Sequence, residues 1–295
     1  MKRKKVTILT ATYNREKYLS QLYNSLLSQT VQRFEWIIVD DGSTDNTGDL
    51  VNDFISQKNI DIIYIKKENG GKHTALNKGV EYVKTPLTFI VDSDDILTDD
   101  AIQIIENDYL EIMSNNYCGL AYLRGYNSTN VIGDPFLNEG YANMNTIRYK
   151  NHIKGDKAEV WKTDYLKKTP FPVFKGEKFI GEHYVWCQLS EKYDMYVRNK
   201  IIYITEYLEG GLTKSGRKMR ITCPYGGIAS SNILISNKYP LKTRIKNSLL
   251  YICYNFFANE KLGVILSNSK SPILTLCMLP FGYLMYKYWT FKYCN

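Results

Sequence analysis

The sequence predicts an α/β protein in which a mostly parallel sheet is flanked by helices and followed by a helical C-terminal extension. Three observations support this prediction. Apolar strand-like runs alternate with helical patterns over the first hundred residues, 44% of the 295 residues are hydrophobic, and acidic residues almost disappear after residue 210. Alternating strands and helices favour parallel pairing with right-handed crossovers. A chain of this length buries one or two cores.

Each element of the N-terminal part follows from its residue pattern. Short apolar runs predict strands at 6–10, 34–39, 60–65 and 87–91. Apolar residues at helical spacing predict a first helix over 18–27, with Asn14 as its N-cap. Two more helices are expected, one from Thr44 or Asp45 to Lys58 and one over 73–83.

An acidic cluster, Asp92-Ser93-Asp94-Asp95, comes directly after the fourth predicted strand. Crowded carboxylates repel one another, and a divalent cation is their usual partner. Ligand sites in open α/β sheets lie at the carboxyl ends of strands. The cluster therefore predicts a place where Mn²⁺ or Mg²⁺ meets a phosphate. The alternative is that these acids only begin a helix, because the first turn of a helix favours negative charge.

Two other strand ends bring polar side chains to the same edge of the sheet. Thr12-Tyr13-Asn14-Arg15 follows the first strand, and Asp40-Asp41-Gly42-Ser43 closes the second. An aromatic ring can stack on a base, and a carboxylate can accept a hydrogen bond from a ring N–H. A metal at Asp94 can bridge two phosphates. Together the three segments predict a nucleotide site.

In these segments the chain resembles the family 2 glycosyltransferases, which have the GT-A fold. The matching stretches are Thr10-Ala11-Thr12-Tyr13-Asn14-Arg15, Val39-Asp40-Asp41-Gly42-Ser43-Thr44-Asp45 and Val91-Asp92-Ser93-Asp94-Asp95, in the order and spacing of the family. The resemblance extends over residues 4–210. It implies a metal-dependent, inverting transferase that moves a sugar from a nucleoside-diphosphate donor, a UDP-sugar, to an acceptor hydroxyl.

The resemblance also implies a role for each site residue. The residues expected to contact the nucleotide-sugar donor are Thr12, Tyr13, Asp40, Asp41, Lys72, Asp92 and Ser93. Of these, Tyr13 and Asp41 are expected at the uracil base, and Asp92 at the sugar–ribose region. Asp94 is expected to bind Mn²⁺ or Mg²⁺, and Asp95 to lie near the donor sugar or the acceptor as a catalytic residue. Two structural alternatives stay open: Tyr13 as a cap on the core, and Asp40 as a cap on the turn that follows it.

Lys72 follows Asn69-Gly70-Gly71 at the start of a predicted helix. Glycine allows a ligand to approach the backbone closely, and a helix N-terminus favours anions. Lys72 is therefore expected at the diphosphate, and a solvated surface lysine is the alternative. The neighbouring His73 is expected to be a local cap more often than a ligand.

The catalytic base is expected at Glu182, within Phe179-Ile180-Gly181-Glu182-His183-Tyr184-Val185-Trp186. The family usually reads Glu-Asp here, and in this chain His183 replaces the second acid. His183 stays open as the base because its unperturbed pKa of about 6.5 suits proton transfer. The departure also leaves open a second class of function, a catalytically inactive sugar-nucleotide-binding protein. A nucleotidyltransferase is disfavoured, because no glycine-rich basic loop follows the first strand.

Charge and apolar content set the last part of the chain apart. Residues 210–295 contain twelve Lys and Arg and one acid, Glu260, so they carry +11 while residues 1–209 carry −3. The nearly uncharged run Pro272–Tyr286 is shorter than the roughly 20 residues that span a bilayer. Tyrosine and tryptophan mixed with lysine suit a membrane interface. We expect this region to bind an anionic membrane surface and no nucleic acid, with a helical cap on the domain as the alternative.

These observations predict an organisation and a location. A nucleotide-sugar-binding half is expected at 1–100, an acceptor-binding half at 101–210 and a basic, apolar helical region at 211–295. Six scattered cysteines without a C-x-x-C pair fit a reducing cytoplasm. The expected location is therefore cytoplasmic and peripheral, on the inner face of the cell membrane. A glycan or lipid-linked acceptor in surface polysaccharide synthesis fits that location.

Overall fold

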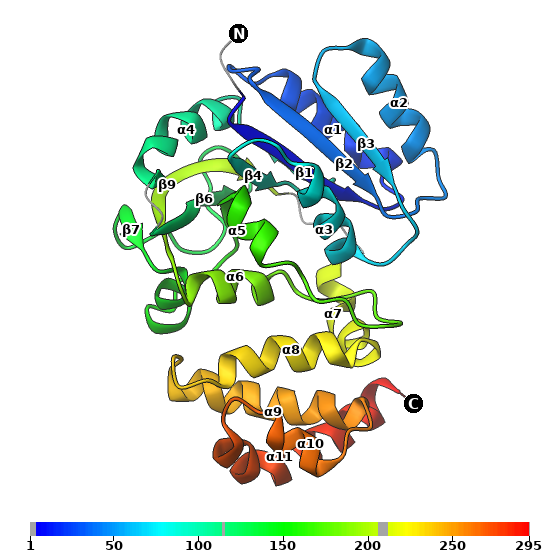
Figure 1. The fold of residues 1–295 in the computed structure, drawn as a ribbon, viewed down its shortest axis with the longest axis vertical. Helices are drawn as coiled ribbons and strands as arrows, with labels where there is room; N and C mark the ends of the chain where they lie inside the picture. Colours follow the sequence, from blue (N-terminus) through cyan, green and yellow to red (C-terminus); the bar gives the residue numbers. More distant parts are fainter. Residues whose placement is uncertain (1–3, 114–115, 206–211, 295) are drawn as a thin grey trace. The chain divides into compact units, whose positions relative to one another are not determined.

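A single mixed sheet forms the centre of the α/β part (Figure 1). The computed structural model describes residues 4–113, 116–205 and 212–294, and within them nine strands join this sheet. The strands are β1 (Val6–Thr12), β2 (Phe34–Asp40), β3 (Ile62–Lys66), β4 (Leu87–Ile90), β5 (Ile96–Leu97), β6 (Tyr117–Gly125), β7 (Gly140–Ala142), β8 (Lys157–Lys162) and β9 (Asp194–Ile204). Their order is β3-β2-β1-β4-β8-β6-β9-β5, and β7 pairs with β9.

The sheet has a parallel half and a mixed half. Strands β3, β2, β1 and β4 are parallel, as the alternating sequence pattern predicts. Strand β8 is antiparallel to both β4 and β6, whereas β6 and β9 are parallel. Strands β5 and β7 are both antiparallel to β9. The sequence pattern does not predict this second half.

Helices and short helical turns connect the strands of the sheet. They are α1 (Glu16–Leu27), α2 (Thr47–Gln57), α3 (Lys72–Tyr82), α4 (Ala101–Asp108) and α5 (Thr163–Lys168), with the short turns η1 (Tyr109–Ile112) and η2 (Thr146–Lys150). Strand side chains alternate between faces. Val6 and Ile8 join the core formed with α1, α2 and α4. Leu9 faces α3, where a Cβ added to Gly79 would lie 2.2 Å from Leu9 Cδ1.

The chain divides into two compact units. The first contains the sheet and comprises Met1–Pro170 and Leu189–Tyr207; the second comprises Phe171–Gln188 and Leu208–Asn295. Helix α6 (His183–Ser190) begins in the second unit and ends in the first. The divisions predicted at residues 100 and 210 stay a prediction. By its contacts, the segment 171–188 belongs with the C-terminal helices.

The second unit is helical, as predicted for the C-terminal extension. Its remaining helices are α7 (Leu212–Thr222), α8 (Pro224–Ile235), α9 (Leu241–Phe257), α10 (Leu262–Ser267) and α11 (Pro272–Tyr293). Glycines allow α9 to pack closely on two neighbours: a Cβ would lie 2.6 Å from Tyr254 at Gly227 in α8, and 2.6 Å from Ile252 at Gly282 in α11. Within the part of the chain that the structure describes, none of the helices combines the length and hydropathy that a membrane crossing requires.

Two predicted element boundaries were wrong. Asn14 does not cap α1: it has φ +52°, its Oδ1 accepts the Thr44 N–H at 2.9 Å, and Arg15 takes the N-cap position. The second helix begins later than expected, at Thr47, whose N–H donates to Asp45 at 3.1 Å. The apolar run Pro272–Tyr286 forms part of a longer helix, which passes through Pro280 and ends at Tyr293.

Candidate functional site

The carboxyl ends of β1, β2 and β4 meet at one edge of the sheet. Thr12, the last residue of β1, is in register with Asp40, the last residue of β2, and the Asp41 N–H donates to Thr12 O at 2.8 Å. The acidic cluster follows β4, whose extension is paired to β1 through the Val91 N–H and Leu9 O at 3.0 Å. The structure thus brings together the three segments that the sequence analysis selected, as expected for parallel strands.

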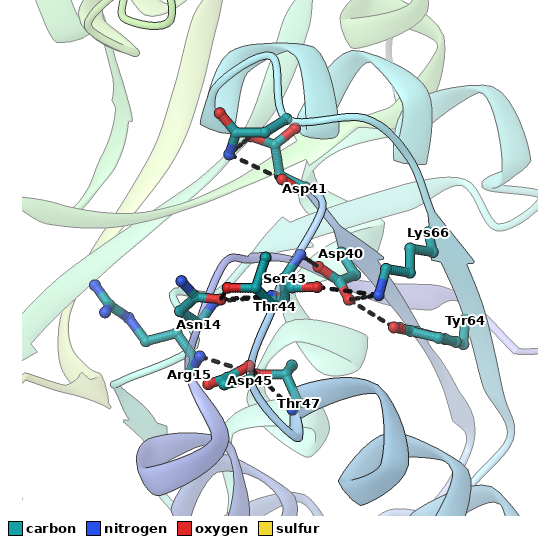
Figure 2. Close-up of polar contacts among 11 residues, drawn as sticks. Asn14, Arg15, Asp40, Asp41, Ser43, Thr44, Asp45, Thr47, Tyr64 and Lys66 are labelled. Atoms are coloured by element: carbon teal, nitrogen blue, oxygen red, sulfur yellow. Dashed lines mark hydrogen bonds and ion pairs between the residues drawn. The ribbon is translucent and has the colours of Figure 1, made fainter.

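Asp40 is fully buried and organises the turn after β2. Its Oδ1 accepts the Ser43 N–H at 2.7 Å, and its Oδ2 accepts the Tyr64 hydroxyl at 2.6 Å. Figure 2 shows both contacts, with Lys66 alongside. Gly42 within this turn has φ +83°, which favours glycine. The structural role considered for Asp40 is therefore present, and two of the roughly four acceptor positions of its carboxylate have no donor among the described residues.

The segment after β1 is clamped against the same turn (Figure 2). The Asn14 N–H donates to Ser43 Oγ at 2.9 Å, and the Arg15 N–H donates to Thr47 Oγ1 at 3.0 Å. Tyr13 precedes this clamp and is 46% exposed, so it does not cap the core. Its ring has no stacking partner among the described residues and is accessible to a ligand.

Thr12 has a buried hydroxyl without a partner. Its Oγ1 is buried, and no described residue forms a hydrogen bond with it. Buried polar atoms in folded proteins almost always have a partner. A ligand at this sheet edge would provide one.

Asp41 holds the loop that leads into α3. Its two oxygens accept hydrogen bonds from Lys67 Nζ at 2.6 Å, the Gly71 N–H at 2.7 Å, the Gly70 N–H at 3.0 Å and Asn69 Nδ2 at 3.2 Å. A carboxylate has about four acceptor positions, so these donors fill them. The expected contact between Asp41 and a base stays a prediction, and it would require one of these donors to be displaced.

Asp92 lies between two cations. It forms an ion pair with Lys72, the first residue of α3, and its Oδ2 lies 3.9 Å from the Arg124 guanidinium. Burial by itself would raise the pKa of Asp92, but Lys72 and Arg124 outweigh burial and lower the pKa below its ordinary value. Asp92 is therefore ionised, and it holds the Lys72 ammonium beside the acidic cluster.

Asp95 is in a different state from Asp92. It is buried, its Oδ2 accepts the Tyr203 hydroxyl at 2.7 Å, and Arg124 lies 3.8 Å away. Burial, followed by repulsion from Asp92, raises the pKa of Asp95 to about 7. A group with this pKa can exchange a proton at neutral pH, which is a property of catalytic carboxyls.

Asp94 is half-buried, as is Asp92. No described residue forms a hydrogen bond or ion pair with its carboxylate, whereas Asp92 and Asp95 both have protein partners. No group of three potential metal ligands occurs among the described residues. Mg²⁺ in phosphate-transfer sites is usually held by one or two carboxylates together with substrate phosphates. The half-buried Asp94 carboxylate, which has no partner among the described residues and lies next to buried Ser93, fits that kind of site.

Three residues of the site, Lys67, Arg124 and Tyr203, were not predicted from the sequence. The Arg124 guanidinium lies 4.0 Å from the centroid of the Tyr203 ring, and the Tyr203 hydroxyl also accepts the Asp92 N–H at 2.9 Å. Both residues are on strands of the mixed half, β6 and β9, and no motif surrounds them. Lys67 directly follows β3, and its position at that sheet edge was the one available signal.

Glu182 directly precedes α6 and belongs to the second unit. Its carbonyl oxygen accepts the Val185 N–H at 3.0 Å and the Trp186 N–H at 3.2 Å, so it forms part of the first turn. His183 is the first residue of the helix itself. The assignment of the base to Glu182 or His183 stays a prediction.

Comparison with known proteins identifies the family. The model of glycosyl transferase family 2 matches residues 7–167, more than half of the chain. The chain therefore belongs to glycosyl transferase family 2, and the resemblance inferred from its three motifs is confirmed.

Individual relatives agree with this assignment. Glycosyltransferase GlyA of Streptococcus pneumoniae serotype 4 is 26% identical over 255 residues, which are 82% of this chain and 36% of that protein. The matched region is 36% of GlyA and 33% of a second relative, glycosyltransferase GlyG of the same organism, so it spans about a third of each.

Solved structures share the fold. A 1–349 form of Staphylococcus aureus TarS in complex with UDP matches with a TM-score of 0.62 at 16% identity, covering 98% of this chain and 91% of that chain. The mannosyltransferase PcManGT from Pyrobaculum calidifontis, in complex with GDP-Man and Mn²⁺, matches with a TM-score of 0.60 at 16% identity, covering 98% and 83%. The predicted GT-A fold is confirmed.

Proposed function

We propose that this chain is an inverting, metal-dependent glycosyltransferase. It would move a sugar from a UDP-sugar to a hydroxyl of a glycan or lipid-linked acceptor in surface polysaccharide synthesis. The observation that carries the proposal is the half-buried Asp94 carboxylate at the carboxyl end of β4, which no described residue neutralises. Family membership and a fold shared with UDP-bound TarS support the same reading.

The nucleotide would lie across the ends of β1 and β2. The exposed Tyr13 ring is available to stack on the uracil base, because its neighbours hold the segment in place. Thr12 Oγ1 offers an unused hydrogen-bonding group, and Asp40 retains acceptor capacity. Asp92 would face the sugar–ribose region from the other side, with Ser93 next to it.

The diphosphate would lie between Asp94 and the start of α3. A divalent ion held at Asp94 would neutralise the charge that develops on the leaving diphosphate. Lys72 supplies a cation at a helix N-terminus, where backbone N–H groups also favour an anion. In the structure Lys72 pairs with Asp92, so a diphosphate would share or take over this ammonium.

Proton transfer would complete the reaction. The base, Glu182 or His183, would accept the proton of the acceptor hydroxyl while the hydroxyl oxygen attacks the anomeric carbon from the face opposite the diphosphate. Configuration at that carbon would invert. Asp95, whose pKa of about 7 allows both protonation states, would contact the donor sugar or the acceptor. General acid–base catalysis of this kind contributes about 10²–10⁴ in rate.

A polymer or lipid-linked acceptor at the cytoplasmic face of the membrane fits the rest of the chain. The S. aureus relative TarS, 31% identical over 101 residues, has the name poly(ribitol-phosphate) beta-N-acetylglucosaminyltransferase. The basic helical unit, with twelve Lys and Arg after residue 210, favours an anionic membrane surface. These two facts support an acceptor that is assembled at the membrane.

A thermal-shift experiment tests the proposal. Wild type, Asp94→Ala and the control Asp53→Ala, which changes an exposed carboxylate on α2, are heated with UDP or UDP-sugars, with and without Mn²⁺. A ligand that binds only the folded state raises its apparent stability. We expect a metal-dependent UDP shift that disappears in Asp94→Ala and remains in Asp53→Ala. No shift with any nucleotide, in folded protein, would refute the proposal.

Turnover separates the two classes of function. Release of UDP from a UDP-sugar in the presence of Mn²⁺, stopped by Asp94→Ala, supports the transferase. Metal-dependent UDP binding without turnover of any donor would favour the catalytically inactive sugar-nucleotide-binding protein, which the replacement of the usual second acid by His183 leaves open.

A further inference from the structure

One face of α11 is apolar and exposed to solvent. The helix packs on its neighbours through Thr275, Gly282 and Trp289, which recur every seven residues and are buried. On the opposite side, Ile273 is 80% exposed, Leu284 64% and Phe291 75%. A helix that is hydrophobic on all sides is normally buried on all sides. The outer face of α11 is therefore an apolar surface that no described part of the chain buries.

The exposed side chains form a continuous strip. Successive positions fall on one side of the helix because the spacing follows i, i+3, i+4 and i+7. The strip, called the α11 face below, consists of Ile273, Leu276, Cys277, Pro280, Phe281, Leu284, Tyr288 and Phe291. At 1.5 Å per residue it is about 27 Å long. Contiguous exposed apolar surface of this kind marks an interaction site.

Positive charges border the α11 face. Lys287 and Lys292 are both exposed, and their ammonium groups lie 5.4 and 5.7 Å from the ring centroids of Tyr283 and Tyr288. Neither has an acidic partner among the described residues. The one acid after residue 209, Glu260, accepts a hydrogen bond from Tyr225 at 3.0 Å instead. Aromatic rings with lysines beside them match the boundary between acyl chains and headgroups.

This charge pattern favours an anionic lipid surface as the partner of the α11 face. A second copy of the chain that docked through the same face would bring no carboxylate to Lys287 or Lys292, because Glu260 is the one acid after residue 209. An anionic lipid surface supplies the missing negative charge and accepts the apolar strip. We propose that α11 lies in the plane of an anionic membrane with Ile273, Leu284 and Phe291 inserted among the lipids. The proposal rests on the proposed function in one respect, that a lipid-linked acceptor explains why the enzyme would bind a membrane.

Vesicle sedimentation tests the proposal with the full chain. The probes are vesicles of phosphatidylglycerol and phosphatidylcholine, with pure phosphatidylcholine for comparison. The variant is Leu284→Glu with Phe291→Glu, which places two negative charges on the α11 face. The matched control, Leu110→Glu with Leu137→Glu, changes two apolar residues that are 66% and 67% exposed in the first unit. Circular dichroism and thermal melting verify that each protein is folded.

We expect wild type and control to sediment with the anionic vesicles and to bind pure phosphatidylcholine less strongly. The α11 variant should bind the anionic vesicles at least tenfold more weakly. Equal binding by the variant, or no binding by wild type, would overturn the proposal. A wild-type dimer that the variant converts to a monomer, without vesicle binding, would instead identify the face as a contact between copies.

The result is independent of catalysis. UDP-dependent thermal shift without vesicles should be the same in wild type and in the α11 variant, because none of the substituted residues is at the sheet edge. Vesicle binding without a UDP-dependent thermal shift would support membrane binding through the α11 face and refute the proposed function. A UDP-dependent thermal shift without vesicle binding would support the proposed function and refute membrane binding through the α11 face.

Discussion

Replacement of Asp95 by asparagine tests the electrostatics of the site. Asp95 is buried, and its pKa is raised from 3.8 to about 7, first by burial and then by Asp92. Between these two values the folded chain retains a proton that the unfolded chain has lost, so the free energy of unfolding falls as pH rises. At about 1.36 kcal/mol per pKa unit, the loss approaches about 4 kcal/mol above pH 7.

Asparagine resembles the protonated carboxyl and can still accept the Tyr203 hydroxyl. We expect Asp95→Asn and wild type to have similar free energies of unfolding near pH 4. At pH 8 Asp95→Asn should be the more stable protein, by up to about 4 kcal/mol. Urea unfolding followed by fluorescence and circular dichroism between pH 4 and 8.5 measures the difference.

The control is Asp53→Asn, which makes the same substitution at an exposed position on α2. If Asp95→Asn were less stable than wild type at pH 8, Asp95 would be an ionised carboxylate stabilised by Arg124 and Tyr203. The reasoning from burial would then be wrong.

Three further predictions follow from packing and charge. Tyr203→Phe removes the hydrogen bond to Asp95 and leaves the Asp92 N–H without its acceptor, so unfolding should be about 1.5–3 kcal/mol easier in urea titrations; an unchanged midpoint would contradict these contacts. Gly79→Ala forces a Cβ against Leu9 and should lower the free energy of unfolding by about 1–3 kcal/mol. Gly263 has open space around it, so Gly263→Ala should raise the free energy of unfolding by up to about 1 kcal/mol in the same assay. Lys72→Ala removes the ion-pair partner of Asp92 and a cation at the proposed diphosphate site, so the UDP-dependent thermal shift should become smaller. A thermal shift as large as that of wild type would exclude Lys72 from the diphosphate site.

The parallel half of the sheet was predictable because its signals are local. Each strand of β1, β2 and β4 is an apolar run bounded by polar residues, and parallel pairing places their ends at one edge. The motifs that follow these strands also identified the family. Local patterns were sufficient here because each prediction depended on neighbours in the sequence.

The mixed half was not predictable in the same way. Strand β8 pairs with β4 and β6, which lie far from it in the sequence, and β6 brings Arg124 between Asp92 and Asp95. Pairing between distant strands depends on the whole core, and no residue near Arg124 or Tyr203 indicates it. For the same reason the sequence did not reveal that protein donors fill the acceptor positions of Asp41.

The α/β class, the family and the acidic cluster after β4 can be read from the sequence, because strand periodicity and motif spacing are properties of short stretches of chain. Which carboxylates have partners depends on the folded structure. It gives Asp92 two cations, buries Asp95 against Tyr203 and leaves Asp94 without a partner among the described residues. Likewise, the apolar content of α11 is a property of the sequence, but which side of the helix faces solvent depends on what packs against Gly282. Burial and charge pairing arise from contacts between distant residues, and those contacts exist only in the folded chain.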